Sequence, residues 1–138
     1  MSNRHMNCAQ TVLSTYCDIF NLDRLLALQI AQGFGRGMGR GENNCGAVSG
    51  AYMVIGLARK LPATNPRENV DGTYDLLQEF NRKFSEIHSS LICKDLVGLD
   101  ISTPEGLAEA RNKSIFTTRC PVFVRDAARI LETLLKLS

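Results

Sequence analysis

Tryptophan is absent from this 138-residue chain, and aromatic residues make up only 7% of it. Proteins that bind single-stranded nucleic acid stack bases on aromatic side chains, so a stacking surface of that kind is not expected. A strong charge excess is lacking too, because 16 Lys and Arg residues stand against 14 Asp and Glu residues, for a net charge of +2. This balance argues against a dedicated nucleic-acid binder and against a membrane-surface protein.

Long apolar runs are missing as well. The longest stretch without a charged residue, from Asn43 to Ala58, has 16 residues and is diluted by glycine and asparagine. A bilayer span needs about 20 apolar residues, so we expect no membrane-spanning helix. The N-terminal segment lacks the apolar core of a secretion signal. We therefore expect a single cytoplasmic domain over residues 1–138, in which thiols stay reduced unless they bind metal or do redox work.

Alternating strand patterns are also lacking, and helical periodicity runs through nearly the whole chain. It predicts an all-α, single-domain bundle of about five to six helices around a buried central helix from Cys45 to Lys60. A first helix, capped by Asn3 or Asn7, carries an apolar stripe at Val12, Leu13, Tyr16, Cys17 and Phe20. The other expected helices are Leu22 to Phe34, Tyr74 to Leu91, Cys93 to Leu99, Ser102 to Ser114, and Pro121 to the C-terminus.

Two of these helices have apolar residues that we expect to face the core. In the second helix they are Leu25, Leu26, Leu28 and Ile30, and in the 74–91 helix they are Leu76, Leu77, Phe80, Phe84, Ile87 and Leu91. The segment Gly33 to Gly41 has alternate glycines, which cannot hold a regular helix and which permit positive φ. The sequence predicts a loop there, just before the central helix.

The five cysteines, at positions 8, 17, 45, 93 and 120, are widely spaced. No Cys-x-x-Cys occurs, which excludes a thioredoxin-type pair, a zinc ribbon and a c-type haem attachment. Four of the five lie at predicted helix starts, where unpaired N–H groups favour thiolate over thiol. Cys17 lies mid-helix on the apolar stripe, and we expect it to belong to the core.

Charged side chains near these cysteines have two interpretations each. Arg36 and Arg40 of the glycine-rich segment could hold an anion beside the thiols, or be solvated or paired with Glu42. No phosphate-binding motif supports the first interpretation on its own. Of the two histidines, His5 and His88, His88 could serve as a base or a further ligand, although a helix-surface position is the simpler expectation. Lys94 would lower the pKa of Cys93 if it lies close.

The segment Cys45-Gly-Ala-Val-Ser-Gly50 matches a CGAxxG motif. With it, the chain resembles the small redox-active proteins defined by that motif and four characteristic cysteines, the C_GCAxxG_C_C family. Asn7-Cys8-Ala9, the glycine-rich segment and the two later cysteines extend the resemblance over most of the chain. By position, the family cysteines correspond to Cys8, Cys45, Cys93 and Cys120. The resemblance implies a redox-active or cysteine-ligated centre in a protein often encoded near transporter genes.

The motif also has a physical interpretation. Gly46 removes a side chain beside the thiol and leaves room for a ligand, while Gly50 lets a neighbouring helix pack closely. Together with Arg36 and Arg40, these glycines are our candidates for contacts to a cofactor.

Three functions remain open. Cys8, Cys45, Cys93 and Cys120 could ligate an iron–sulfur cluster or zinc for electron transfer. They could instead carry out thiol–disulfide exchange, with Cys45 attacking and another cysteine resolving. Or they could merely fill space in a helical adaptor of a membrane transporter. Expected partners are a redox protein, a transporter or a second copy in a homodimer, and not nucleic acid. The two redox functions require the four cysteines to converge in space.

Overall fold

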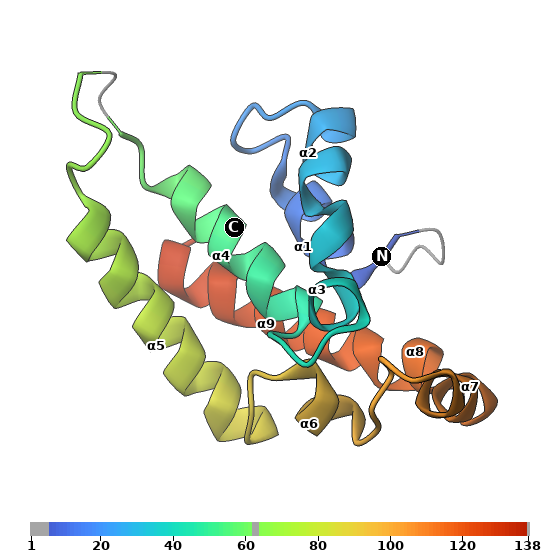
Figure 1. Cartoon of the computed structure of the whole chain (residues 1–138). Coiled ribbons are helices and arrows are strands. Elements are labelled where there is room, and N and C mark those ends of the chain that lie inside the picture. Colours follow the sequence, from blue (N-terminus) through green and yellow to red (C-terminus); the bar gives the residue numbers. More distant parts are fainter. Residues whose placement is uncertain (1–5, 62–63, 138) are drawn as a thin grey trace.

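The computed structural model describes residues 6–61 and 64–137, and in these residues the chain is helical, with no strand (Figure 1). The all-α fold is thus confirmed. In chain order the elements are α1 (Cys8–Tyr16), α2 (Arg24–Ala31), the short 3-10 helix η1 (Gln32–Phe34), α3 (Gly35–Arg40), α4 (Gly46–Ala58), α5 (Val70–His88), α6 (Cys93–Val97), α7 (Pro104–Asn112), α8 (Ile115–Thr118) and α9 (Cys120–Leu135).

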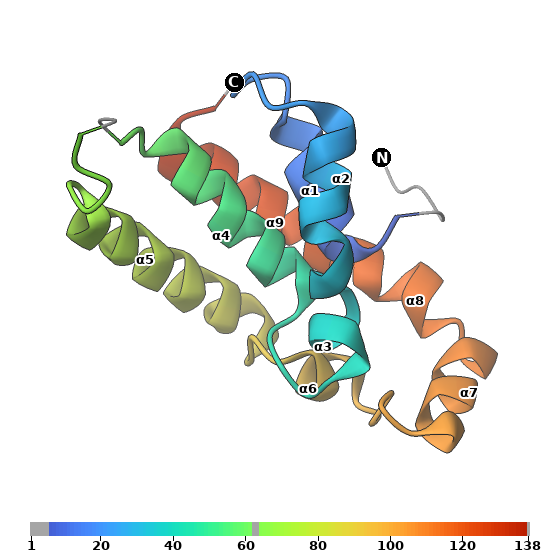
Figure 2. The ribbon, with the colours of Figure 1, turned by 45° about the horizontal axis from the view of Figure 1, so that its top comes forward.

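Helix α4 runs through the middle of the molecule (Figures 1 and 2). It contacts α1 on one side and α5 on the other, and α9 packs behind it (Figure 2). Its Val48, Val54 and Ile55 are fully buried, as are Phe80 and Phe84 of α5. The predicted central helix is confirmed, although it begins at Gly46 and ends at Ala58.

Helix α4 crosses α1 at two glycines. A Cβ atom at Gly50 would lie 3.0 Å from the Ala9 carbonyl oxygen and 3.0 Å from Val12 Cβ. At Gly46 it would lie 3.0 Å from Ala9 N and from Cys8 Cβ. The predicted close packing is confirmed at both positions. The space beside Gly46 that we expected for a ligand is filled by α1 itself.

Asn7 fixes the start of α1. Its side chain accepts a hydrogen bond from the Gln10 N–H (2.9 Å), and the Gln10 side chain accepts one from the Asn7 N–H (3.0 Å). This capping box satisfies two N–H groups that would otherwise lack partners. Asn7 is therefore the cap, and Asn3 and His5 lie outside the described residues. The helix stops at Tyr16, short of Phe20.

The glycine-rich segment is a turn of left-handed helix. Arg36, Gly37, Met38 and Gly39 all have left-handed φ and ψ, and Arg40 has a φ of 64°. Positive φ is therefore confirmed, but α3 is an ordered turn where we predicted a loop. The conformation costs a non-glycine residue about 1–2 kcal/mol, and Gly37 and Gly39 adopt it without this cost.

The predicted apolar stripe of α2 is wrong. Leu25, Leu26 and Ile30 are 66%, 46% and 48% exposed, whereas Ala27 and Ala31 are fully buried. Alanines on this face let α2 lie close along α1, and the larger apolar residues point to the outside.

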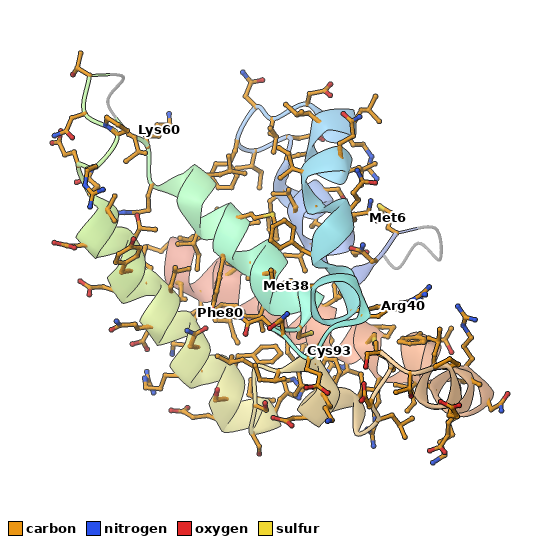
Figure 3. All side chains as sticks on the ribbon, in the orientation of Figure 1. Met6, Met38, Arg40, Lys60, Phe80 and Cys93 are labelled. Carbon is orange, nitrogen blue, oxygen red and sulfur yellow. The ribbon has the colours of Figure 1, made fainter. Side chains whose placement is uncertain are left out.

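Helix α5 begins at Val70, a little before the predicted Tyr74, and ends at His88. Phe80 and Phe84 face the core as predicted (Phe80 is labelled in Figure 3). Ile87, predicted to face inward, is exposed. His88 takes the inward position, because it continues the four-residue spacing of the two phenylalanines.

In the C-terminal third, the structure has the predicted helices and one additional helix. Thr103 caps α7 by accepting a hydrogen bond from the Gly106 N–H (3.0 Å), and Pro104 opens the helix. The short α8 was not predicted. A second, smaller apolar cluster joins α6, α7 and α8. Among the described helices, none has both the length and the apolar character needed to span a bilayer.

Candidate functional site

Four cysteines begin four helices. Cys8, Cys93 and Cys120 are the first residues of α1, α6 and α9, and Cys45 is the N-cap of α4. The predicted helix-start placement is therefore confirmed. Cys17 differs, because it is buried at the C-terminal end of α1 and its thiol donates to the Ser14 carbonyl (3.1 Å). It belongs to the core, as expected.

A two-stranded contact brings Cys45 and Cys93 together. Asn44 and Ile92 form an isolated antiparallel bridge. Beside it, the Cys45 N–H donates to the Leu91 carbonyl (2.8 Å), and the Cys93 N–H donates to the Asn43 carbonyl (2.9 Å). The segments before α4 and α6 are thus paired. Both thiols are buried, with residue exposures of 4% for Cys45 and 5% for Cys93.

The other two cysteines complete the cluster. The side chains of Cys8 and Cys120 interact directly, with the Cys8 thiol donating to Cys120 Sγ. Gly46, next to Cys45, lies against Cys8, and a Cβ at Gly37 would lie 2.9 Å from Cys93 Cβ. Figure 3 shows Cys93 beside the α3 turn that carries Met38 and Arg40. The structure therefore brings Cys8, Cys45, Cys93 and Cys120 to one place, although they are far apart in the sequence.

Cys120 is the most acidic member of this cluster. The hydrogen bond from Cys8 lowers the pKa of Cys120 below its usual value of 9.0, and the positive charges of Arg36 and Arg119 lower it further against the opposing effect of burial. Arg119 is held in place by hydrogen bonds to the carbonyl groups of Leu96 (3.3 Å) and Val97 (3.0 Å). Cys120 is thus the thiol best prepared to act as a thiolate.

The expectation that all four helix starts favour thiolate is wrong for the other three. The pKa of Cys8 is raised well above its usual value by the hydrogen bond to Cys120 and by burial. Burial raises the pKa of Cys45 to about 11, despite the N–H groups of Ala47 and Val48, and that of Cys93 to about 12. Removal of a thiolate from water outweighs the partial charge of a helix end. Cys45 is therefore a poor attacking group.

Arg36 and Arg40 behave differently from each other. The charge of Arg36 lowers the pKa of both Cys93 and Cys120, as an arginine beside the thiols should. Its guanidinium carbon lies 4.0 Å from the centre of the Phe116 ring. Arg40 is exposed at the end of the turn, and Figure 3 shows it directed away from Cys93. Glu42 forms its ion pair with Lys94 (3.1 Å), and Lys94 is not among the charges that shift the pKa of Cys93.

His88 is neither a surface residue nor part of the cysteine cluster. Its side chain is 12% exposed and lies between Phe84 and Phe123, and its Nε2 is 2.8 Å from Asp126 Oδ2. The helix-surface expectation is wrong, because α9 covers this position. The Ser90 hydroxyl donates a hydrogen bond to Asp95, and the Ser102 hydroxyl donates one to Asp100. Neither carboxylate is hydrogen-bonded to Cys93.

The described side chains do not form a ready metal-binding group. In residues 6–61 and 64–137, no three His, Cys, Asp or Glu side chains converge in a way that could hold a metal ion. Cys8 and Cys120 interact through their side chains, and the buried Cys45 and Cys93 lie close enough to them for the thiols to influence one another electrostatically.

A pocket of about 600 Å³ opens beside Cys8 and Cys120. We call it the Cys120 pocket. Arg36 and Phe116 form one wall, and one face of α9 forms another. Neither Cys45 nor Cys93 lines it. The sequence pattern did not single out Phe116 or Arg119 as site residues. Arg119 could have been found from its position next to Cys120, but no motif marks Phe116.

Comparison with protein families identifies this constellation. The family described as "putative redox-active protein (C_GCAxxG_C_C)" matches residues 6–134, nearly the whole chain. The chain belongs to this family. The matched range includes all four clustered cysteines and the CGAVSG segment, so the resemblance inferred from the motif is confirmed. Neither a curated protein nor a solved structure matches the chain.

Proposed function

We propose that this C_GCAxxG_C_C protein carries out thiol–disulfide exchange, with Cys120 as the attacking thiolate and Cys8 as the resolving thiol. One observation carries the proposal: the two side chains interact at the edge of a pocket, and their pKa values are shifted in opposite directions. An attacking thiol that loses its proton more readily, beside a resolving thiol that keeps its proton longer, is the arrangement that a two-step exchange needs.

In the first step, the Cys120 thiolate attacks one sulfur of a disulfide in the pocket. The S–S bond of the substrate breaks, one half forms a mixed disulfide with Cys120, and the other half leaves as a thiolate. Arg36 and Arg119 stabilise negative charge at Cys120, and Arg36 lines the same pocket into which the leaving thiolate is released.

The first step prepares the second. Cys8 holds its proton chiefly because it donates to Cys120 Sγ. Once Cys120 is in a mixed disulfide, that thiolate is gone and the pKa of Cys8 falls. Cys8 then loses its proton to the departing thiolate or to water and attacks Cys120 Sγ. The products are a Cys8–Cys120 disulfide and two reduced halves of the substrate, so the protein dithiol is oxidised and the substrate reduced.

Cys45 and Cys93 take no part in the reaction in the pocket. Their pKa values of about 11 and about 12 keep them protonated at neutral pH, and a protonated thiol is not a nucleophile.

A trapping experiment tests the proposal. Reduced protein is treated with bis(2-hydroxyethyl) disulfide at neutral pH, and the modified peptides are identified by mass spectrometry. We expect Cys8→Ser to accumulate a mixed disulfide on Cys120, Cys120→Ser to react far more slowly, and the control Cys17→Ser to form the internal disulfide like the parent. Preferential modification of Cys45 or Cys93 would refute the assignment.

The iron–sulfur or zinc centre remains a prediction, as do the protein redox partner, the transporter and the homodimer. Metal analysis and an absorption spectrum after anaerobic purification test the first. Our proposal expects four titratable thiols in the cluster and no stoichiometric metal.

A further inference from the structure

The Cys120 pocket is built along one face of α9. Cys120, Pro121, Val124, Arg125, Ala128 and Arg129 all line it. These positions recur with helical spacing, and they cover roughly 13 Å of helix at 1.5 Å per residue. The reactive sulfur therefore lies at one end of an elongated pocket, and charged side chains lie at the other.

Most of the pocket surface is apolar. Phe116 lines it together with the α9 residues Pro121, Val124 and Ala128. A volume of about 600 Å³ is in the range of sites that take small organic molecules. A substrate with a hydrocarbon portion would bury that portion here.

Positive charge exceeds negative charge in the lining. Three arginines, Arg36, Arg125 and Arg129, share the pocket with one carboxylate, Glu132. Among the described residues no carboxylate lies within ion-pair distance of Arg36, which rests on the Phe116 ring. At the far end, Arg125 and Arg129 share Asp126 at 3.1 and 4.0 Å.

Asp126 cannot neutralise both of these arginines. Its Oδ2 atom already lies 2.8 Å from His88 Nε2, and its own side chain is only 9% exposed. The Arg129 side chain is 70% exposed and its ion pair is at the limit of contact, so its guanidinium is available to a ligand. Glu132 is engaged by the Tyr16 hydroxyl, which donates to it over 3.4 Å.

We propose that the Cys120 pocket binds small organic disulfides that carry an anionic group such as a carboxylate. Phe116 and Val124 contact the hydrocarbon portion, the S–S bond lies at Cys120, and Arg129 with Arg125 binds the anionic group. This assignment rests on the proposed exchange function and names its substrate class. The reaction balances as above: the anionic disulfide is reduced to two thiols, and Cys8 and Cys120 are oxidised.

A charge series of matched disulfides tests it. 3,3′-Dithiodipropionate, bis(2-hydroxyethyl) disulfide and cystamine share a two-carbon spacer and end in a carboxylate, a hydroxyl and an ammonium group. The rate of Cys8–Cys120 disulfide formation is measured with each at low ionic strength. This rate is divided by the rate at which 2-mercaptoethanol reduces the same small disulfide at the same pH, which gives a normalised rate for each compound. We expect the anionic compound to exceed the cationic one by about tenfold or more, and high salt to reduce this ratio.

Arg129→Gln should lower the normalised rate of dithiodipropionate several-fold more than that of the neutral compound. Lys83→Gln removes one positive charge from α5 outside the pocket. It should leave the normalised rates of dithiodipropionate and of the neutral compound unchanged. Equal normalised rates for the three compounds, or an Arg129→Gln effect of the same size on all three, would overturn the substrate assignment while leaving the exchange function intact. If none of the three oxidises the pair, the proposed function fails and the assignment fails with it.

Discussion

Cys45 and Cys120 both stand at the start of a long helix, yet their thiols ionise differently. Cys120 receives a hydrogen bond from Cys8 and faces two arginines, whereas Cys45 is enclosed by α1 and its neighbours. A helix end contributes about 0.3–1 kcal/mol, which burial of a charge readily exceeds. The sequence predicts which residues begin helices. It could not predict which of them the tertiary packing would desolvate.

The pH dependence of alkylation tests the state of Cys120. We expect its rate with iodoacetamide to reach half its maximum at a lower pH than that of a free cysteine peptide, because the pKa of Cys120 is lowered. The rate should fall as the pH drops through that lowered pKa, since the thiolate is then lost. Cys8→Ala should raise the midpoint most and Arg36→Gln somewhat less. A parent midpoint equal to that of a free cysteine peptide would contradict our description of the site.

Cys17 provides a contrasting case at the same scale. Its side chain is 1% exposed and none of the four clustered thiols is influenced by it. Cys17→Ala should lower the free energy of unfolding by about 1 kcal/mol, as for the loss of one small buried group. It should leave Cys8–Cys120 disulfide formation unchanged. Both quantities are measured on the same preparation, by urea denaturation and by thiol titration, and a loss of disulfide formation would show that Cys17 belongs to the site.

At the scale of elements, the crossing of α1 and α4 positions the cluster. Gly46 and Gly50 allow the contact, and it places Cys8 directly against the first turn of α4. This much was predictable, because glycines four apart on an apolar helix mark a close crossing. The buried face of α2 was not predictable, because the periodicity of apolar residues does not say whether the leucines or the alanines face the neighbouring helix.

Substitution of one buried and one exposed glycine of α4 tests the crossing. Gly50→Leu should lower the free energy of unfolding by about 1–3 kcal/mol or more, because the new side chain meets α1 backbone at about the 3.0 Å found for Ala9. Gly56→Leu is the matched control. Nothing lies within 4 Å of its Cβ position. Leucine also has a higher helix propensity than glycine, by about 0.8 kcal/mol. Thermal and urea denaturation should show opposite signs for the two variants, and a parent-like Gly50→Leu would contradict the placement.

The left-handed turn of α3 was predictable only in part. Alternate glycines indicate positive φ, but Arg36, Met38 and Arg40 adopt it as well. Their strain is sustained by the packing of Gly35 against Asn7 and of Gly37 against Cys93. Since these are contacts between distant segments, local sequence carries no sign of them. They explain why Arg36 points toward the thiols.

At the scale of the molecule, four chain segments converge on one site. The family cysteines could be identified from the motif and from helix starts, and the structure brings all four together. The division into an accessible pair and a buried pair could not be predicted. It depends on where α9 begins relative to α1, and on the bridge between Asn44 and Ile92.

The buried pair should make the protein sensitive to alkali. Because the folded pKa of Cys45 is raised from 9.0 to about 11, its contribution to stability is complete below pH 9 and is lost as the pH rises toward 11. Two pKa units correspond to roughly 2–3 kcal/mol. Cys45→Ser cannot ionise there and keeps a good N-cap. With reductant present, the free energy of unfolding of the parent should fall relative to this variant between pH 8 and 11, and a constant difference would contradict the burial of Cys45 as a thiol.

The most direct test of the central claim is the identity of the first disulfide formed. Fully reduced protein receives one equivalent of bis(2-hydroxyethyl) disulfide at neutral pH, is quenched in acid and is digested without reduction, and the linked peptides are identified by mass spectrometry. Our account predicts a peptide pair joined through Cys8 and Cys120, with Cys45 and Cys93 still reduced. A first disulfide between Cys45 and Cys93, or one that joins Cys120 to either of them, would contradict it.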